Sequence, residues 1–424
     1  MTAPRKRIAI VGAGVSGLVT AHLLHAQHDV TVFEAQDRAG GHAWTVDVDL
    51  PDGPLAVDIG FLVFNDRNYP HFEALLAELG VESRASDMSF SVSDGADFEY
   101  AGNGPRGLLA NPKHLYDRKF LKMVAEYIRF NKDAKALMDG DEDPSLRDWL
   151  RDLGYSDYFV HRLIVPQASA VWSADPEQMW SFPARFLVQF FDNHGLLGFR
   201  DRPEWRTVVG GSRRYVEAII ARLGSERVRL GAEVTAVERD ADGVTVTARG
   251  GEPERFDEVV LATHSDQALA LLTEPTGLER ERLGAIPYLP SELVLHTDTS
   301  LLPRRRAAWA SWNAHYVEEP MGTPAVSYWL NNLQGHEIDR ELIATLNLTD
   351  RIDPAKVIAR FDVAHPTYTP DGIETQRRHA EISGVNRTHY AGAYWSWGFH
   401  EDGVKSGHRV AAAILTAEPD RAIA

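Results

Sequence analysis

The sequence predicts an α/β fold, in which a parallel sheet binds a nucleotide and an α+β lobe is inserted into the chain. Residues 8–11 form a short apolar run, which is typical of a parallel strand buried on both faces. Gly12, Gly14 and Gly17 follow directly in G-x-G-x-x-G spacing. A second strand pattern at residues 29–34 ends on an acid. Together these observations predict a Rossmann-like βαβ unit.

Each residue of this unit has a physical task. Gly12 lets the chain turn out of the strand, Gly14 leaves room for a pyrophosphate, and Gly17 lets the helix pack close to the sheet. Ser16 lies in the first turn of that helix, where free N–H groups face the anion. Glu34 follows Gly17 by 17 residues, where an acid can bind a ribose hydroxyl.

The composition limits the class of protein. The chain has 424 residues, a net charge of −17 and no cysteine. This length allows two or three lobes, and the negative charge argues against a nucleic-acid surface, which needs a basic stripe. The lack of cysteine excludes disulfides and thiolate metal sites. Residues 5–24 resemble a signal peptide, but glycines interrupt them, and no stretch is long and apolar enough for a transmembrane helix, so we expect a cytoplasmic protein.

A second glycine-rich segment follows Glu34. Arg38, Gly40 and Gly41 lie directly after the second predicted strand, which suggests a backbone passing close to a ligand, with Arg38 placed for phosphate. An ordinary loop is the alternative. Gly60 then lies at another turn, two residues after an acid.

These segments resemble the FAD-binding half of the flavin amine oxidase superfamily, which includes amine oxidases, protoporphyrinogen oxidases and phytoene-desaturase-like enzymes. The resemblance implies non-covalent FAD in a GR2-type Rossmann domain, with the second glycine-rich loop along the pyrophosphate and ribityl chain. An NAD-only dehydrogenase has no need of that loop. The resemblance also implies that the backbone around Val234 holds the adenine.

Residues 390–409 resemble the C-terminal flavin motif of the same superfamily. In that motif a helix N-terminus points at the flavin pyrimidine and stabilises negative charge there. Ala393 stands where the family often has an acid, and Phe399 stands where amine oxidases place a cage tyrosine. The residues predicted to bind FAD are Gly12, Gly14, Ser16, Gly17, Glu34, Ala35, Arg38, Gly40, Gly41, His42, Thr45, Gly60, Val234, Gly392, Gly403 and Val404.

Three neighbouring residues are the catalytic candidates. His400 is the preferred base, because it lies beside the flavin-helix turn and can titrate near neutral pH. The alternative for His400 is a structural hydrogen bond to Glu401 or Asp402. Phe399 and Glu401 complete the catalytic set. Adjacent residues in one turn seldom converge on one ion, so we expect no metal.

The remaining pattern predicts two interleaved regions. The FAD-binding domain is predicted at residues 1–68, 205–265 and 380–424, and the substrate-binding lobe at 69–204 and 266–379. The lobe is predicted to contain helices at 70–79, 120–137, 145–153, 158–165 and 183–191, and strands at 292–297, 307–313 and 325–330. The partly basic helix at 120–137 is either a solvated face or a site for lipid headgroups, which leaves peripheral membrane contact open.

Three functions are compatible with this pattern. The first is desaturation, dehydrogenation or isomerisation of a lipophilic substrate, such as a fatty acyl chain or an isoprenoid, because the lobe is aromatic and has no obvious amine cage. We then expect residues 172–194, the strands of 292–330 and residues 394–400 to face the flavin with few charges. The second is amine or polyamine oxidation, and the third is flavin binding without turnover. The exact substrate, the electron acceptor and the oligomeric state stay open.

Overall fold

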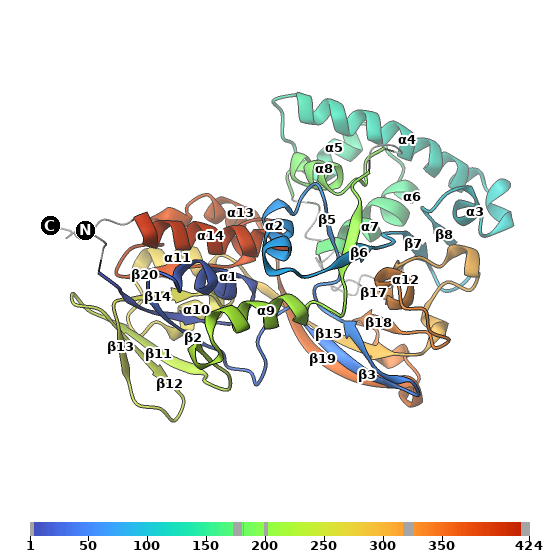
Figure 1. Cartoon of the computed structure of the whole chain (residues 1–424). Helices are drawn as coiled ribbons and strands as arrows, with labels where there is room; N and C mark the ends of the chain where they lie inside the picture. The colour runs from blue at the N-terminus through green and yellow to red at the C-terminus, as the bar shows by residue number, and fades with distance from the viewer. Residues whose placement is uncertain (1–3, 173–179, 181, 199–201, 317–324, 417–424) are drawn as a thin grey trace.

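The computed structural model describes residues 4–172, 180, 182–198, 202–316 and 325–416, and it has the predicted α/β class (Figure 1). A parallel sheet has the strand order β10–β2–β1–β14–β20. Ile10 of the central strand pairs with Val32 on one side and Val260 on the other. The bounds of these strands are β1 (Arg7–Val11), β2 (Asp29–Phe33), β10 (Val228–Arg229), β14 (Glu258–Leu261) and β20 (Thr388–Tyr390).

Alternate residues of β1 face two different layers, as the two-residue period of a strand requires. Ile8 and Ile10 pack with one layer of helices, while Ala9 and Val11 pack with the layer on the opposite face. The first layer contains α1 (Val15–Leu24), α2 (Pro70–Leu79), α9 (Arg213–Leu223) and α14 (His400–Thr416). The second contains β11 (Val234–Arg239), β12 (Val244–Ala248), β13 (Glu254–Phe256), α10 (Ser265–Leu271) and α11 (Gly277–Gly284).

A second, seven-stranded sheet has the order β19–β15–β18–β17–β16–β7–β8, and its strands pair antiparallel except for β16 with β7. Its strands are β7 (Phe90–Ser93), β8 (Glu99–Ala101), β15 (Tyr288–His296), β16 (Trp312–His315), β17 (Val326–Trp329), β18 (Ile343–Leu346) and β19 (Val357–Pro366). The predicted strand at 307–313 is wrong over most of its length, because a 3-10 turn covers Arg306–Ala308 and β16 begins at Trp312.

The helices of the inserted lobe lie at the far end of the molecule from α1 and α14 (Figure 1). They are α3 (Pro105–Leu108), α4 (Arg118–Asp139), α5 (Leu146–Asp152), α6 (Asp157–Phe159), α7 (Val165–Trp172) and α8 (Ala184–Asn193). The predicted helix at 158–165 continues through a π-helical turn, Val160–Ile164, into α7. Phe120 and Phe130 of α4, with Phe159 and Phe191, are fully buried in the core of this lobe.

Short elements connect the two sheets. They are β3 (Thr45–Leu50), β4 (Gly53–Asp58), β5 (Phe64–Asn65), β6 (Ser83–Ala85), β9 (Trp205–Val208), α12 (Leu330–Gln334) and α13 (Pro370–Gln376). Val48 and Val57 of the β3–β4 hairpin share a core with Leu293 and Leu295 of the second sheet. The predicted domain boundaries stay a proposal. None of the described helices has the length and hydrophobicity needed to cross a bilayer.

Candidate cofactor and active site

The first glycine loop joins β1 to α1. A Cβ on Gly12 would lie 2.7 Å from the Ala262 carbonyl oxygen, and a Cβ on Gly17 would collide with the carbonyl oxygen of Gly12. Both glycines are therefore required by close packing. Gly14 is different, because a Cβ there would meet no protein atom within 4 Å. Gly14 is the N-cap of α1, and no side chain caps this helix end, so its N–H groups face an open surface that suits a pyrophosphate.

Glu34 lies beside this loop at the end of β2. Its carboxylate accepts hydrogen bonds from the backbone N–H of Ala13 (2.8 Å) and of Gln36 (2.9 Å). The Glu34 carbonyl accepts from the N–H of Ala232 (2.8 Å), just before Val234 begins β11. Glu34 and Val234, predicted to hold ribose and adenine, therefore lie together, while the neighbouring Ala35 is exposed.

The second glycine segment runs directly alongside the first. Gly40 donates its N–H to the Ala13 carbonyl (2.8 Å), and a Cβ on Gly41 would lie 3.1 Å from the Cα of Gly14. Arg38 donates to the Gly41 carbonyl (3.0 Å), and its guanidinium lies 3.7 Å from the centroid of the Trp44 ring. Arg38 therefore shapes this loop. The later Gly60 passes so close to His42 that a Cβ would collide with the His42 carbonyl oxygen.

The C-terminal motif is brought to the same place by helix packing. Helix α14 begins at His400, inside the motif of residues 390–409. A Cβ on Gly403 would lie 2.6 Å from Val15 and 3.1 Å from the Ser16 hydroxyl. The first turns of α1 and α14 therefore lie against each other. Gly392 donates its N–H to the hydroxyl of Ser406 (2.9 Å), which ties the end of β20 to α14.

An aromatic wall borders the start of α14. It consists of Phe186, Phe190 and His194, which lie on or directly after α8, together with Trp397 and Phe399. Ring centroids are 5.4 Å apart for Phe190 and Phe399, and 4.2 Å apart for Phe186 and Trp397. Burial lowers the pKa of His194 to about 4, so the wall carries no charge at neutral pH. Both segments belong to the ranges predicted to face the flavin, 172–194 and 394–400, and that orientation stays a prediction. Residues 173–179 and 181 lie outside the described part of the chain.

Three histidines gather beside the second glycine loop. The ring centroid of His42 lies 5.9 Å from that of His264 and 5.5 Å from that of His365. Burial, with the nearby His365 and His264, lowers the pKa of His42 to about 3, and burial lowers the pKa of His365 to about 4. His42 nevertheless keeps solvent-accessible surface. No sequence pattern singles out His365, which lies on β19.

The comparisons with known proteins agree with this geometry. The family model for flavin containing amine oxidoreductases matches residues 15–300. The chain belongs to this family. It is 29% identical, over 65% of its length, to the "Putative flavin-containing monoamine oxidase AofH" of Mycobacterium tuberculosis, and the match spans 61% of that relative, less than two thirds.

Solved structures show the same fold at lower identity. Cyclohexylamine oxidase from Brevibacterium oxydans IH-35A has a TM-score of 0.66 at 18% identity, covering 97% of this chain and 99% of that one. The CLA-producing fatty acid isomerase from P. acnes has a TM-score of 0.68 at 15% identity, covering 96% of this chain and 98% of that one. The predicted superfamily, fold and FAD cofactor are thereby confirmed.

The residues present fit FAD. The uncapped N-terminus of α1, the open side of Gly14 and the carboxylate of Glu34 form one continuous cradle. The N-terminus of α14 follows beyond the second glycine loop. Among the described residues, no group of three His, Asp or Glu side chains could hold a metal ion.

Thr45 does not fit the predicted role of a cofactor ligand through its side chain. Its hydroxyl donates to the Asp58 carboxylate (2.6 Å) and accepts from the N–H of Arg213 (3.0 Å). Asp58 also accepts from both the backbone N–H and the hydroxyl of Ser212 (2.8 Å each). Burial raises the pKa of Asp58 to about 6 despite these donors. This buried junction joins the β3–β4 hairpin to α9.

Glu401 is a helix cap, which argues against the predicted catalytic role. Its side chain is buried, and its two oxygens accept from the backbone N–H groups of His71 (3.1 Å) and Phe72 (2.9 Å), in the first turn of α2. The same carboxylate lies 2.7 Å from Nδ1 of His71. Both oxygens are therefore used in holding α2 against α14.

His400 also differs from the prediction. Its ring stacks on Phe61 with centroids 3.8 Å apart, and its Nε2 lies 2.8 Å from the Tyr215 hydroxyl. Burial, with the nearby His42, lowers the pKa of His400 to about 3. A neutral, hydrogen-bonded imidazole with this pKa is a weak base, and its partner is Tyr215, not Glu401 or Asp402. His400 therefore makes the contacts of a structural residue at the start of α14, and its catalytic role stays a prediction.

We expect Gly14→Val to fold normally and to lose FAD, because the added methyl groups would occupy the surface that the pyrophosphate needs. Flavin absorbance per purified chain should fall at least about tenfold, a loss of about 1.4 kcal/mol or more. Circular dichroism should match the wild type. Gly277→Val is the control, because its Cβ would also meet no atom within 4 Å but lies in α11. Full flavin content in Gly14→Val would contradict this placement of the cofactor.

We expect Glu401→Gln to destabilise the protein, because it weakens two charge-assisted hydrogen bonds that cap α2. The loss should be about 1–3 kcal/mol, seen as a lower midpoint of thermal unfolding. Glu217→Gln, which removes an exposed carboxylate 3.4 Å from Arg214, should leave the midpoint nearly unchanged. An unchanged midpoint for Glu401→Gln, combined with lost flavin reduction, would restore the catalytic role.

We expect the imidazole of His400 to remain neutral across the physiological range. Since its pKa is lowered to about 3, its NMR chemical shifts should stay constant between about pH 5 and 8, where an ordinary histidine titrates. The signal is assigned by its loss in His400→Gln. A titration step near neutral pH would make His400 a candidate base again.

Proposed function

We propose that the protein is an FAD-dependent oxidoreductase that removes hydride from a lipophilic substrate, such as a fatty acyl chain or an isoprenoid. The observation that carries this proposal is the uncharged aromatic wall beside the start of α14. Phe186, Trp397 and Phe399 in this wall are only partly buried, so they present apolar surface. An apolar chain gains free energy by leaving water for such a surface, whereas an unpaired charge would lose it.

The roles of the chain's own residues follow from the geometry. Bound FAD would supply a hydride acceptor held against one face of the substrate. The N-terminus of α1 and Glu34 would hold its phosphate and ribose ends. The N-terminus of α14 would stabilise negative charge at the opposite end. The aromatic wall would orient the apolar substrate and exclude water.

One structural neighbour supports a lipophilic substrate. The P. acnes protein of the same fold is named for production of a conjugated fatty acid by isomerisation. At 15% identity this likeness concerns the fold, so the choice of substrate rests on the wall itself.

Amine oxidation is the second candidate. It is favoured by the family model and by the monoamine oxidase relative from Mycobacterium tuberculosis. Against it, Phe399 replaces the tyrosine expected in an amine cage. The neutral histidines beside the second glycine loop are compatible with either substrate.

We expect anaerobic mixing with fatty acyl or isoprenoid lipids to bleach the flavin absorbance, while simple amines leave it unchanged. Phe186→Glu should raise the lipid concentration needed for half-maximal bleaching at least about tenfold, because it places a charge in the apolar wall. Phe186→Leu is the matched control and should stay close to the wild type. Rapid bleaching by monoamines or polyamines, without an effect of lipids, would favour the amine candidate.

A further inference from the structure

We propose that the outer face of helix α4 docks the protein on an anionic membrane surface. Figure 1 shows α4 along the outer edge of the inserted lobe. Its inner side is anchored by buried Phe120, Met123 and Phe130, so the opposite side is a fixed surface and not a fraying helix. Membrane contact through this face does not depend on the proposed activity.

The outer face of α4 carries an apolar stripe. Leu121 and Ile128 are 46% and 58% exposed, and the exposed Ala125 lies between them. These residues are four and three positions apart, so they line up along one side of the helix. Leu115 and Tyr116, just before α4, are 50% and 86% exposed. These five include four of the nine large hydrophobic side chains that are most exposed among the described residues.

Basic residues lie beside the stripe and within it. They are Arg118, Lys119, Lys122, Arg129, Lys132 and Lys135, all exposed. Two of the three acids of α4 turn away: Glu126 is buried and accepts from Ser156, and Asp133 is half-buried and accepts from Tyr155 (2.7 Å). The third, Asp139, is exposed and is the last residue of the helix. Lys122 and Arg129 reach these acids only at 3.7 Å and 3.9 Å. Within the described chain, Arg118, Lys119, Lys132 and Lys135 make no ion pair.

The apolar stripe and the basic residues together indicate which kind of partner binds this face. The whole chain carries a net charge of −17, so a cationic face without an exposed acid between residues 118 and 138 is a local departure from its average. A solvated helix face normally mixes both signs. A nucleic acid would match the charge but would leave the apolar stripe in water. An anionic bilayer matches both, since headgroups pair with the basic rows while the stripe enters the interface.

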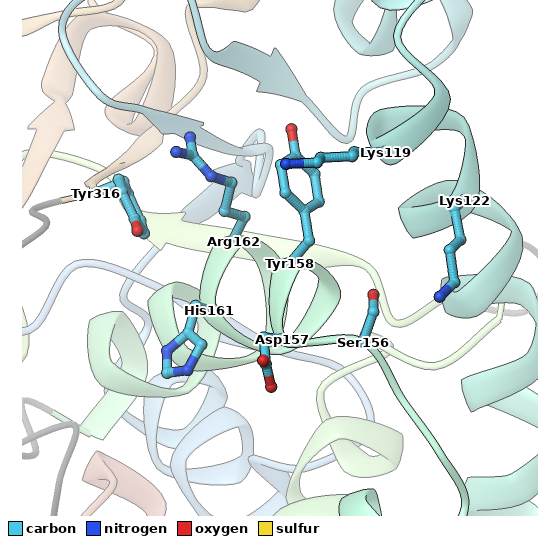
Figure 2. A pocket seen from close by; sticks show the side chains of 8 residues that line it. All are labelled: Lys119, Lys122, Ser156, Asp157, Tyr158, His161, Arg162 and Tyr316. Atoms are coloured by element: carbon cyan, nitrogen blue, oxygen red, sulfur yellow. The ribbon is translucent and has the colours of Figure 1, made fainter.

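A pocket of about 460 Å³ adjoins the docking face. Figure 2 shows Lys119 beside Tyr158, and Lys122 directed toward Ser156. Arg162 lies in the same lining, held by the rings of Phe98 and Tyr316 at 4.3 Å and 4.2 Å. Asp157 and His161 complete the lining with Tyr316. Three cations and three hydroxyls, against one carboxylate, line this hollow and suit the phosphate of a headgroup.

The test is co-sedimentation of the FAD-loaded protein with vesicles. We expect binding to phosphatidylcholine vesicles that contain about 30 mol % phosphatidylserine, at about 0.1 M salt, and none to pure phosphatidylcholine. Neutralising four basic residues should lower the vesicle partition coefficient at least about 100-fold. Removing the stripe with Leu121→Gln and Ile128→Gln should lower it at least about tenfold. The four neutralising changes are Arg118→Gln, Lys122→Gln, Lys132→Gln and Lys135→Gln.

A matched control removes the same charge elsewhere. Four exposed arginines on other elements each pair with a nearby acid, and replacing them should leave vesicle binding nearly unchanged. They are Arg214→Gln, Arg249→Gln, Arg360→Gln and Arg377→Gln. The proposal fails if anionic vesicles do not sediment the protein, or if the α4 and control variants behave alike. It also fails if free inositol hexakisphosphate or RNA binds as tightly as the vesicles and the stripe variant has no effect, which would indicate a soluble polyanion.

Discussion

The close packing of helices α1 and α14 determines where the parts of the cofactor site lie. A Cβ on Gly407 would lie 2.8 Å from the Ser16 carbonyl oxygen and 3.1 Å from Val19. A Cβ on Gly403 would lie 2.6 Å from Val15. Any larger side chain would push the helices apart. Because the first turns of the two helices lie against each other, their N-termini open onto a single binding surface. The other parts of the binding surface are arranged around that contact.

Local signals made much of the fold predictable. The helix predicted at 70–79 is α2, residue for residue, because proline starts it and Gly80 ends it in a left-handed conformation. The first glycine loop and the position of Glu34 were equally predictable, because the backbone geometry of the βαβ unit sets their spacing. Strand β18 gave no such signal. All four of its residues are buried, so it lacks the alternation of a half-exposed strand.

The candidate site was harder to predict, because its side chains are paired across long sequence separations. Glu401 caps α2 by accepting from His71, which is 330 residues away, and His400 bonds to Tyr215, which is 185 residues away. Burial then sets the protonation of each group. A histidine beside the flavin motif suggests a base, yet the rings of Phe61 and Phe72 enclose it and keep it neutral. The sequence near residue 400 predicts neither the hydrogen bond to Tyr215 nor the enclosure by Phe61 and Phe72.

The same helix contact affects how the chain folds while it is being synthesised. Thr20 of α1 donates to the carbonyls of both Ser16 and Gly407, and Thr20 and Gly407 lie 387 residues apart. At about 5–20 residues per second, a ribosome needs about 20–80 s to make that interval. During this time the small-residue face of α1 has no partner, and β14 lacks its outer neighbour β20. This face of α1 therefore stays without its native partner until α14 has been synthesised.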